Sequence, residues 1–220
     1  MKRFGANYIF PVCGPPIRNG LVETNDTGEI LRIIEPDSDF REIHSTQFFN
    51  GVIVPCFINA HCHLELSHLK GLKAKKPGIA GFIEAVTEQR ESNQEHISKS
   101  IADAINQAYK SGTVAIADIC NSASTLPHKQ KSDLYFHNFI ELFGINPDVA
   151  EKTFSQGLIV YNDFTKHYPE STSLTPHSTY SLSEKLWEII SEYLNEKGGE
   201  IVSIHYGESR AEYEFLATGN

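Results

Sequence analysis

Two histidines separated by one residue, His61 and His63, follow the apolar run at 51–60. In a β-strand the side chains alternate between faces, so both imidazoles point to one side and Cys62 points to the other. A long apolar run is typical of a buried parallel strand, and (β/α) barrels carry their catalytic residues where such strands end. Two imidazoles in this arrangement can bind one metal ion. If this motif is considered on its own, the alternative interpretation is that His61 and His63 are ordinary surface or core histidines that bind no metal.

A second pair of reactive side chains, His205 and Glu208, follows the predicted strand at 200–205. His205 offers a third nitrogen to the same ion, and three protein ligands with one open position are typical of a catalytic zinc site. Glu208 lies three residues later, where a general acid/base could exchange protons with metal-activated water and a leaving group. If His205 and Glu208 are considered without the other histidines, the alternative interpretation is that both lie in a solvated loop and have no role in a site. The combination with His61 and His63 favours a metal site.

The composition excludes several classes of protein. The chain has 220 residues, of which 40% are hydrophobic and 21% charged, as expected for a soluble globular protein. A net charge of −9 argues against a nucleic-acid backbone or an anionic membrane as the main partner. The four scattered cysteines predict a reducing, cytoplasmic location. The start of the chain is not a convincing signal peptide, and no segment is apolar enough for a membrane span.

The first 51 residues predict a small β subdomain. Short β-like segments at 7–12, 20–23 and 29–34 are separated by turn signals, and Asn25-Asp26-Thr27-Gly28 is a good hairpin turn. A segment of this size is too small to be stable alone, so we expect it to be part of a small β-sandwich that packs on the rest of the chain.

From residue 52 to residue 220 strands alternate with helices, which is the pattern of a parallel α/β architecture. We expect strands at 52–60, 113–119, 134–143, 173–177 and 200–205, and helices at 79–90, 95–110, from 146 onward, 183–198 and 209–217. A closed (β/α)8 barrel takes about 250 residues. The sequence therefore predicts a TIM-type barrel truncated after about five β/α units.

Four segments, in this order along the chain, resemble the amidohydrolase superfamily. They are Val54-Pro55-Cys56-Phe57-Ile58-Asn59-Ala60-His61-Cys62-His63-Leu64-Glu65, Gly112-Thr113-Val114-Ala115-Ile116-Ala117-Asp118, Thr175-Pro176-His177-Ser178-Thr179-Tyr180-Ser181 and Ser203-Ile204-His205-Tyr206-Gly207-Glu208-Ser209. Within that superfamily the pattern is most similar to the cytosine/guanine deaminase and chlorohydrolase group, which includes S-adenosylhomocysteine and aminofutalosine deaminases.

The resemblance implies roles for individual residues. The resemblance to the amidohydrolase superfamily implies that His61, His63 and His205 bind one divalent ion. Zn²⁺ is the first expectation for this ion, and Fe²⁺ is the alternative. Glu208 carries protons. Two further residues, His177 and Glu65, face the substrate; the alternatives are a helix-entry role for His177 and a solvated loop position for Glu65.

Other positions limit these implications. Related binuclear enzymes carry a bridging lysine where this chain has Pro176-His177, which favours a mononuclear site. Asp118 and Glu141 lie near the ends of predicted strands, and bracing or capping is the first interpretation for both, with substrate contact as the alternative. A histidine after strand six and a metal-binding aspartate after strand eight have no counterpart in these 220 residues.

The function expected from this resemblance is hydrolysis of carbon–nitrogen bonds other than peptide bonds. The substrate would be a purine-like or nucleoside-derived nitrogen heterocycle, which the enzyme deaminates. Chlorohydrolase or cyclic amidase chemistry on the same scaffold is one alternative. An inactive fragment that binds only metal or a partner is another. Because five parallel strands cannot close a barrel, we expect the chain on its own to be inactive and either poorly folded or self-associated as a homo-oligomer.

Overall fold

Pro55 divides the apolar run at 51–60 between two strands. Strand β5 (Thr46–Ile53) ends two residues before it, and β6 (Phe57–Cys62) begins two residues after it. Proline has no N–H to donate to a strand ladder and so interrupts pairing. The prediction of one strand at 52–60 is therefore wrong. The structure separates into two compact units, Met1–Cys56 and Phe57–Asn220.

The computed structural model describes residues 1–36, 45–76, 78–90 and 92–219. In the first unit, the described strands form one sheet around β1, which pairs in parallel with β5 and antiparallel with β2 and β3. The segment expected at 7–12 ends early, because Pro11 cannot donate to a ladder. The bounds are β1 Lys2–Ile9, β2 Ile17–Arg18, β3 Leu21–Thr24 and β4 Ile30–Ile34.

The hairpin turn predicted at 25–28 is confirmed, since β3 and β4 pair antiparallel across it. The side-chain oxygen Oδ1 of Asn25 accepts hydrogen bonds from the backbone N–H groups of Thr27 (3.1 Å) and Glu29 (2.9 Å). Gly28 has a φ of +94°, a conformation that costs glycine little. Local turn chemistry thus explains this hairpin.

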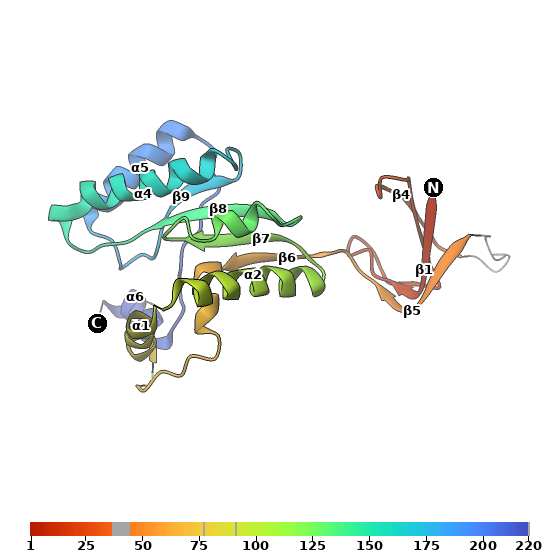
Figure 1. Ribbon diagram of the computed structural model, residues 1–220, viewed down its shortest axis with the longest axis horizontal. Helices are drawn as coiled ribbons and strands as arrows, with labels where there is room; N and C mark the ends of the chain where they lie inside the picture. Colours follow the sequence, from red (N-terminus) through yellow and green to blue (C-terminus); the bar gives the residue numbers. More distant parts are fainter. Residues whose placement is uncertain (37–44, 77, 91, 220) are drawn as a thin grey trace. The chain divides into compact units, whose positions relative to one another are not determined.

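The second unit holds a parallel sheet in the order β6-β7-β8-β9, with helices between the strands. Figure 1 shows α4 and α5 stacked beside β8 and β9, while α2 lies along β6 and β7. This alternation confirms the α/β class. The bounds are β7 Thr113–Cys120, β8 Tyr135–Leu142, β9 Thr172–Pro176, α1 Gly78–Gln89, α2 Gln94–Lys110, α3 Leu126–Lys129, α4 Ala150–Thr165, α5 Glu184–Lys197 and α6 Arg210–Thr218, with the 3₁₀ helices η1 Leu64–Leu69 and η2 Pro147–Val149.

Polar N-cap residues explain where three of these helices begin. The Asn93 side chain accepts from the N–H of Glu95 at the start of α2, and Ser183 accepts from Leu186 in α5. Ser209 does the same for α6. Each cap provides an acceptor for an N–H group that has no partner within the helix. The helix starts near 95, 183 and 209 are thereby confirmed.

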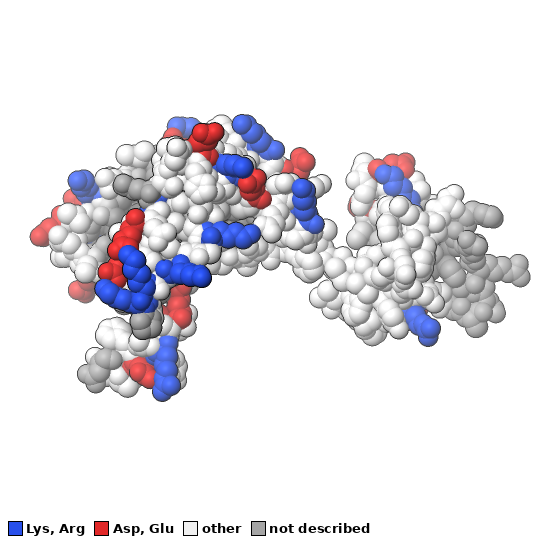
Figure 2. Space-filling model, turned by 60° about the horizontal axis from the view of Figure 1, so that its bottom comes forward, with Lys and Arg blue, Asp and Glu red and all other residues white. Residues whose placement is uncertain are grey.

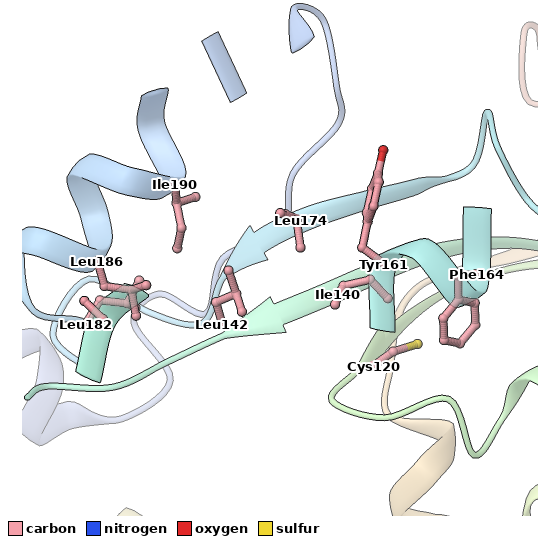
Figure 3. Close-up of a cluster of buried hydrophobic side chains, with 10 residues drawn as sticks. Cys120, Ile140, Leu142, Tyr161, Phe164, Leu174, Leu182, Leu186 and Ile190 are labelled. Atoms are coloured by element: carbon pink, nitrogen blue, oxygen red, sulfur yellow. The ribbon is translucent and has the colours of Figure 1, made fainter. Parts of the chain in front are cut away.

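Two apolar clusters hold the helices of the second unit against its sheet. Leu64, Ile101, Ile105, Ile116, Leu134 and Phe136 form one of them, between α2 and the first strands. Figure 3 shows the other, in which side chains of α4 and α5 face β8 and β9. Removing such side chains from water is the main stabilising term of the fold. The second cluster consists of Cys120, Ile140, Leu142, Ala150, Tyr161, Phe164, Leu174, Leu182, Leu186 and Ile190.

Strand β6 is exposed, although the apolar run predicted a buried strand. The exposed fractions of Phe57 and Ile58 are 57% and 71%. In the described part of the chain, β6 pairs with β7 and has no second neighbour, which makes it an edge strand. The expectation of burial is wrong here. An apolar run shows that a strand has side chains suited to burial, but it does not show which other elements of the chain pack against that strand.

Residues 200–205 do not form the predicted fifth strand. Only an isolated parallel bridge joins His205 to Ser178, where the His205 N–H donates to the His177 carbonyl at 2.7 Å. Elsewhere the segment follows β9 through side-chain hydroxyls: Ser173 Oγ donates to the carbonyl of Ile201, and Thr175 contacts both backbone groups of Ser203. The backbone groups of Ile201 and Ser203 are therefore hydrogen-bonded to side-chain hydroxyls of β9, whereas in a β-ladder they would be bonded to the backbone of the neighbouring strand.

On the face drawn in Figure 2, acidic and basic side chains lie interspersed among uncharged ones. None of the helices within the described ranges combines the length and the apolar character that crossing a membrane requires.

Candidate metal centre

The three candidate ligands come from two segments that end at the same side of the sheet. His61 is part of β6, and His63 immediately precedes η1. His205 lies at the end of the segment that runs alongside β9, where its N–H is bonded to the His177 carbonyl. Because these segments run parallel, their carboxyl ends bring residues that are more than 140 positions apart in sequence into one place.

The imidazoles of His61, His63 and His205 converge. The Nε2 atoms of His63 and His205 are 3.2 Å apart, and the centroid of the His61 ring lies 4.6 Å from that of His205. One nitrogen from each ring can be chosen so that all three lie within 4.8 Å of one another. Ligand atoms about 2.0–2.1 Å from one tetrahedral ion lie about 3.3 Å apart. The three rings therefore fit a single metal ion.

Two of the three rings, those of His61 and His63, have a lowered pKa, which favours the neutral form that a metal requires. Burial, followed by the neighbouring histidines, lowers the pKa of His63 to about 4. Burial and then the charge of His205 also lower the pKa of His61. A histidine binds metal through a deprotonated nitrogen, so a lowered pKa keeps the ligand available at neutral pH. Cys62 packs instead against the apolar cluster on α2, and burial raises its pKa to about 11.

Asp118 braces the chain directly after His63. Its Oδ1 accepts the backbone N–H of Leu64 at 2.7 Å, and its Oδ2 lies 2.6 Å from Lys129 Nζ. Both side chains are fully buried, and Lys129 also donates to Asn138 Oδ1 at 2.7 Å. A buried carboxylate needs such a partner. The bracing role that the sequence favours for Asp118 agrees with these contacts; Lys129 was not singled out.

Glu65 is buried and fully bonded rather than solvated. Its carboxylate accepts from Arg90 Nη2 at 2.6 Å and from the backbone N–H groups of Asn121 and Ser122, each at 3.1 Å. Burial raises the pKa of Glu65, and the charge of Arg90 opposes that shift. These contacts tie the turn after His63 to the end of β7, and they favour bracing over the substrate contact that the resemblance implies.

His177 lies against the candidate ligands. Its ring stacks on that of His205, with centroids 4.5 Å apart and an interplanar angle of 18°. Its Nδ1 is 3.1 Å from Ser181 Oγ. Burial and then the charge of His205 lower the pKa of His177 to about 4. With Nδ1 in contact with the serine, Nε2 is the nitrogen left for a substrate.

Glu141 approaches the other side of His205. Its Oε1 lies 3.3 Å from His205 Nδ1, and its Oε2 accepts from Asn121 Nδ2 at 3.0 Å. The residue is buried, which raises its pKa. A carboxylate beside the far nitrogen of a ligand histidine is a common means of orienting the ring. Glu141, His177 and His205 also form a second group with ligand atoms within 4.8 Å.

Glu208 is exposed and follows Gly207, whose φ of +71° makes the turn. The negative charge of Glu208 acts on His61 and partly opposes the lowering of its pKa. The sequence did not single out Glu212, which contacts the backbone of this turn, although Ser209 and Glu212 form the Ser-x-x-Glu signature of a helix start.

Comparison with known proteins identifies the family. Residues 52–219 match the amidohydrolase family, and the chain belongs to it. It is 27% identical to an aminodeoxyfutalosine deaminase of a Nitratiruptor species over 177 residues, which cover 78% of this chain and 42% of the relative.

Solved structures agree with that assignment at the level of the fold. All of this chain superimposes on 54% of Helicobacter pylori aminofutalosine deaminase, solved in complex with methylthio-coformycin, with a TM-score of 0.79 and 20% identity. An adenosine deaminase of Xanthomonas campestris with bound zinc matches 99% of this chain over 52% of its own, with a TM-score of 0.69 and 14% identity. The chain thus spans about half the length of these proteins, and its α/β unit is consistent with part of a barrel.

Proposed function

We propose that this protein is a metal-dependent deaminase of a purine-like or nucleoside-derived heterocycle. The observation that carries the proposal is the convergence of His61, His63 and His205 on one point at the ends of parallel segments. The family and the deaminase relatives support hydrolysis of a carbon–nitrogen bond. The similar fold of a zinc-bound adenosine deaminase supports Zn²⁺ as the ion.

In this proposal, His61, His63 and His205 hold one divalent ion. Such an ion supplies Lewis acidity, which makes a nucleophile available from water at neutral pH. The overall reaction joins the water oxygen to the ring carbon that carries the amino group, and the carbon–nitrogen bond breaks to release ammonia.

Glu208 carries protons in this proposal. Its carboxylate takes one proton from the attacking water and delivers it to the adjacent ring nitrogen. It then takes the proton of the newly attached hydroxyl and delivers it to the departing amine, which leaves as ammonia while the carbon–oxygen double bond forms. An exposed carboxylate at a turn can reach a substrate that enters from solvent, whereas the buried Asp118 and Glu65 are already bonded to the protein. His177 Nε2 is proposed to contact the heterocycle. For Glu65, a direct substrate contact stays a prediction from the resemblance.

The proposal is tested by ammonia release. The full-length protein that carries this sequence is incubated with adenosine or guanine as probes, and ammonia and the oxo product are quantified. We expect equal amounts of both from at least one probe, loss of the reaction after chelation, and recovery with Zn²⁺. Chloride release from a chlorinated triazine, or opening of a cyclic amide, with no ammonia from any amino heterocycle would overturn deamination and favour the alternative chemistries.

A further inference from the structure

Glu212 contacts the backbone of the turn that carries Glu208. Its Oε1 accepts the N–H of Gly207 at 2.9 Å, and its Oε2 accepts the N–H of Glu208 at 2.7 Å. Glu212 is buried, with an exposed fraction of 7%. Hydrogen bonds from backbone N–H groups to a carboxylate are charge-assisted and stronger than those between neutral groups. Both oxygens of one side chain thus fix two consecutive peptide groups.

This arrangement differs from an ordinary helix cap. In a capping box, the glutamate at the third helical position bonds the N–H of the N-cap residue itself. Here Ser209 is the N-cap, and its hydroxyl accepts the N–H of Glu212 at 3.1 Å. The Glu212 carboxylate reaches past Ser209 to the two preceding residues. Ser209 therefore caps the N-terminus of α6, while the Glu212 carboxylate binds the backbone N–H groups of the preceding turn.

The turn joins the candidate metal ligand His205 to α6. Gly207 has a φ of +71°, and on its other side the chain leads to His205, which is bonded to the His177 carbonyl. Two N–H groups that point toward one carboxylate define the direction in which the Glu208 side chain leaves the backbone. A catalytic group must be held close to its productive geometry, and a displacement of about 1 Å can cost about 100-fold in rate.

We propose that Glu212 is a positioning residue for Glu208. The inference rests on the proposed function, in which Glu208 exchanges protons with the substrate. Glu212 does not itself touch the reacting atoms; it acts through the two peptide groups that it binds. Glu212→Ala removes both acceptors, and Glu212→Gln keeps one oxygen and replaces the other with a donor.

The test compares these variants with two controls on the same helix. Ser209→Ala removes the cap of α6 but leaves the Glu212 carboxylate. Glu214→Gln changes a carboxylate whose contact is with Arg210 on the helix surface. In the full-length protein, kcat, KM and bound metal are measured for each variant. Backbone amide hydrogen exchange is followed at residues 207 and 208.

For Glu212→Ala we expect faster exchange at both amides and a kcat that is lower by about 10–100-fold, with KM and metal content near those of the parent. Glu212→Gln should fall between the parent and Glu212→Ala, which keeps the proposal testable where the alanine variant folds poorly. Ser209→Ala should lower the melting temperature without a comparable loss of kcat, and Glu214→Gln should change neither.

A kcat of Glu212→Ala and Glu212→Gln no lower than that of Ser209→Ala would overturn the inference, as would loss of bound metal in step with activity. Failure of the proposed function has a different signature. If Glu208→Gln leaves kcat unchanged, Glu208 is not the proton carrier. If Glu208→Gln abolishes turnover while Glu212→Ala does not, the proposed function stands and only the positioning role is wrong.

Discussion

At the scale of single residues, the site has two layers of different chemistry. Three imidazoles converge at its centre, and buried carboxylates lie one contact behind them. Asp118 holds the backbone after His63, and Glu141 lies beside His205. Because buried charge is costly unless it is bonded, each carboxylate has partners within the protein. Glu208 is different: it is exposed, and only its backbone N–H is fixed.

Glu208→Gln tests that difference. Glutamine keeps the size and the hydrogen-bonding reach of the side chain but cannot carry a proton. In the full-length protein we expect turnover to fall by about 10²–10⁴-fold, the usual contribution of a positioned acid/base. Bound metal, measured by atomic absorption, should stay at the parent level. The matched control is Glu214→Gln, an exposed carboxylate on α6. Loss of metal together with turnover would make Glu208 a ligand instead.

The sequence predicted the convergence of the histidines because strand periodicity and the parallel arrangement both act over short, regular distances. It did not predict the environment of Glu65. The partners of that carboxylate are Arg90, Asn121 and Ser122, which come from other elements between 25 and 57 residues away. No local pattern around residue 65 records them, so the residue could not be distinguished from a solvated loop position.

At the scale of elements, the segment at 200–205 delivers His205 without being a strand. An apolar run of that length is typical of a strand, but β9 offers it hydroxyls as well as backbone groups. Side-chain partners of this kind compete with a ladder. The sequence correctly predicted that the segment follows β9 along the chain and ends at His205. It did not predict how the segment pairs, because that depends on contacts of Ser173 and Thr175 that only the structure shows.

Thr175→Val is expected to loosen that segment. Valine has the shape of threonine but cannot accept the N–H of Ser203, a contact of 2.8 Å, so the backbone that leads to His205 loses support. We expect Zn²⁺ affinity to fall by about 10–100-fold, as for other outer contacts of metal ligands. Unfolding in urea should show a loss of about 1–3 kcal/mol for the unpaired backbone group.

The control for this variant is Thr172→Val in the same strand. The Thr172 hydroxyl is also buried, but it donates to the Tyr168 carbonyl at 2.8 Å and not to the segment at 200–205. It should therefore lose stability to a similar degree while Zn²⁺ affinity is kept. Equal affinities for the two valine variants would show that the hydroxyl of Thr175 does not support His205.

At the scale of the whole molecule, the chain spans about half the length of the relatives it matches, and β6 lies at an edge of the described sheet. Exposed apolar edge strands promote association between copies. We expect the 220-residue chain to self-associate in sedimentation velocity. Ile58→Lys should shift it toward monomer, because a charge on an edge strand opposes pairing with a second edge.

Ile145→Lys is the matched control, since Ile145 is 74% exposed, as much as Ile58, but lies outside the strands. It should leave the association unchanged. A monodisperse monomer for the unmodified chain would contradict the expectation, and an equal effect of both lysine substitutions would show that net charge, rather than the β6 edge, controls association.

Binding of one divalent ion by His61, His63 and His205 is tested most directly by calorimetric titration of the metal-free full-length protein with Zn²⁺. We expect one equivalent of Zn²⁺ to bind. The affinity for Zn²⁺ should fall by at least about 100-fold in His63→Asn and in His205→Asn, which exceeds the usual effect of losing an outer contact. The affinity should not change in His167→Asn, because His167 is an exposed residue away from the site. Binding of Zn²⁺ to the His205→Asn variant as tightly as to the parent would show that His205 is not a ligand and would contradict the three-histidine site.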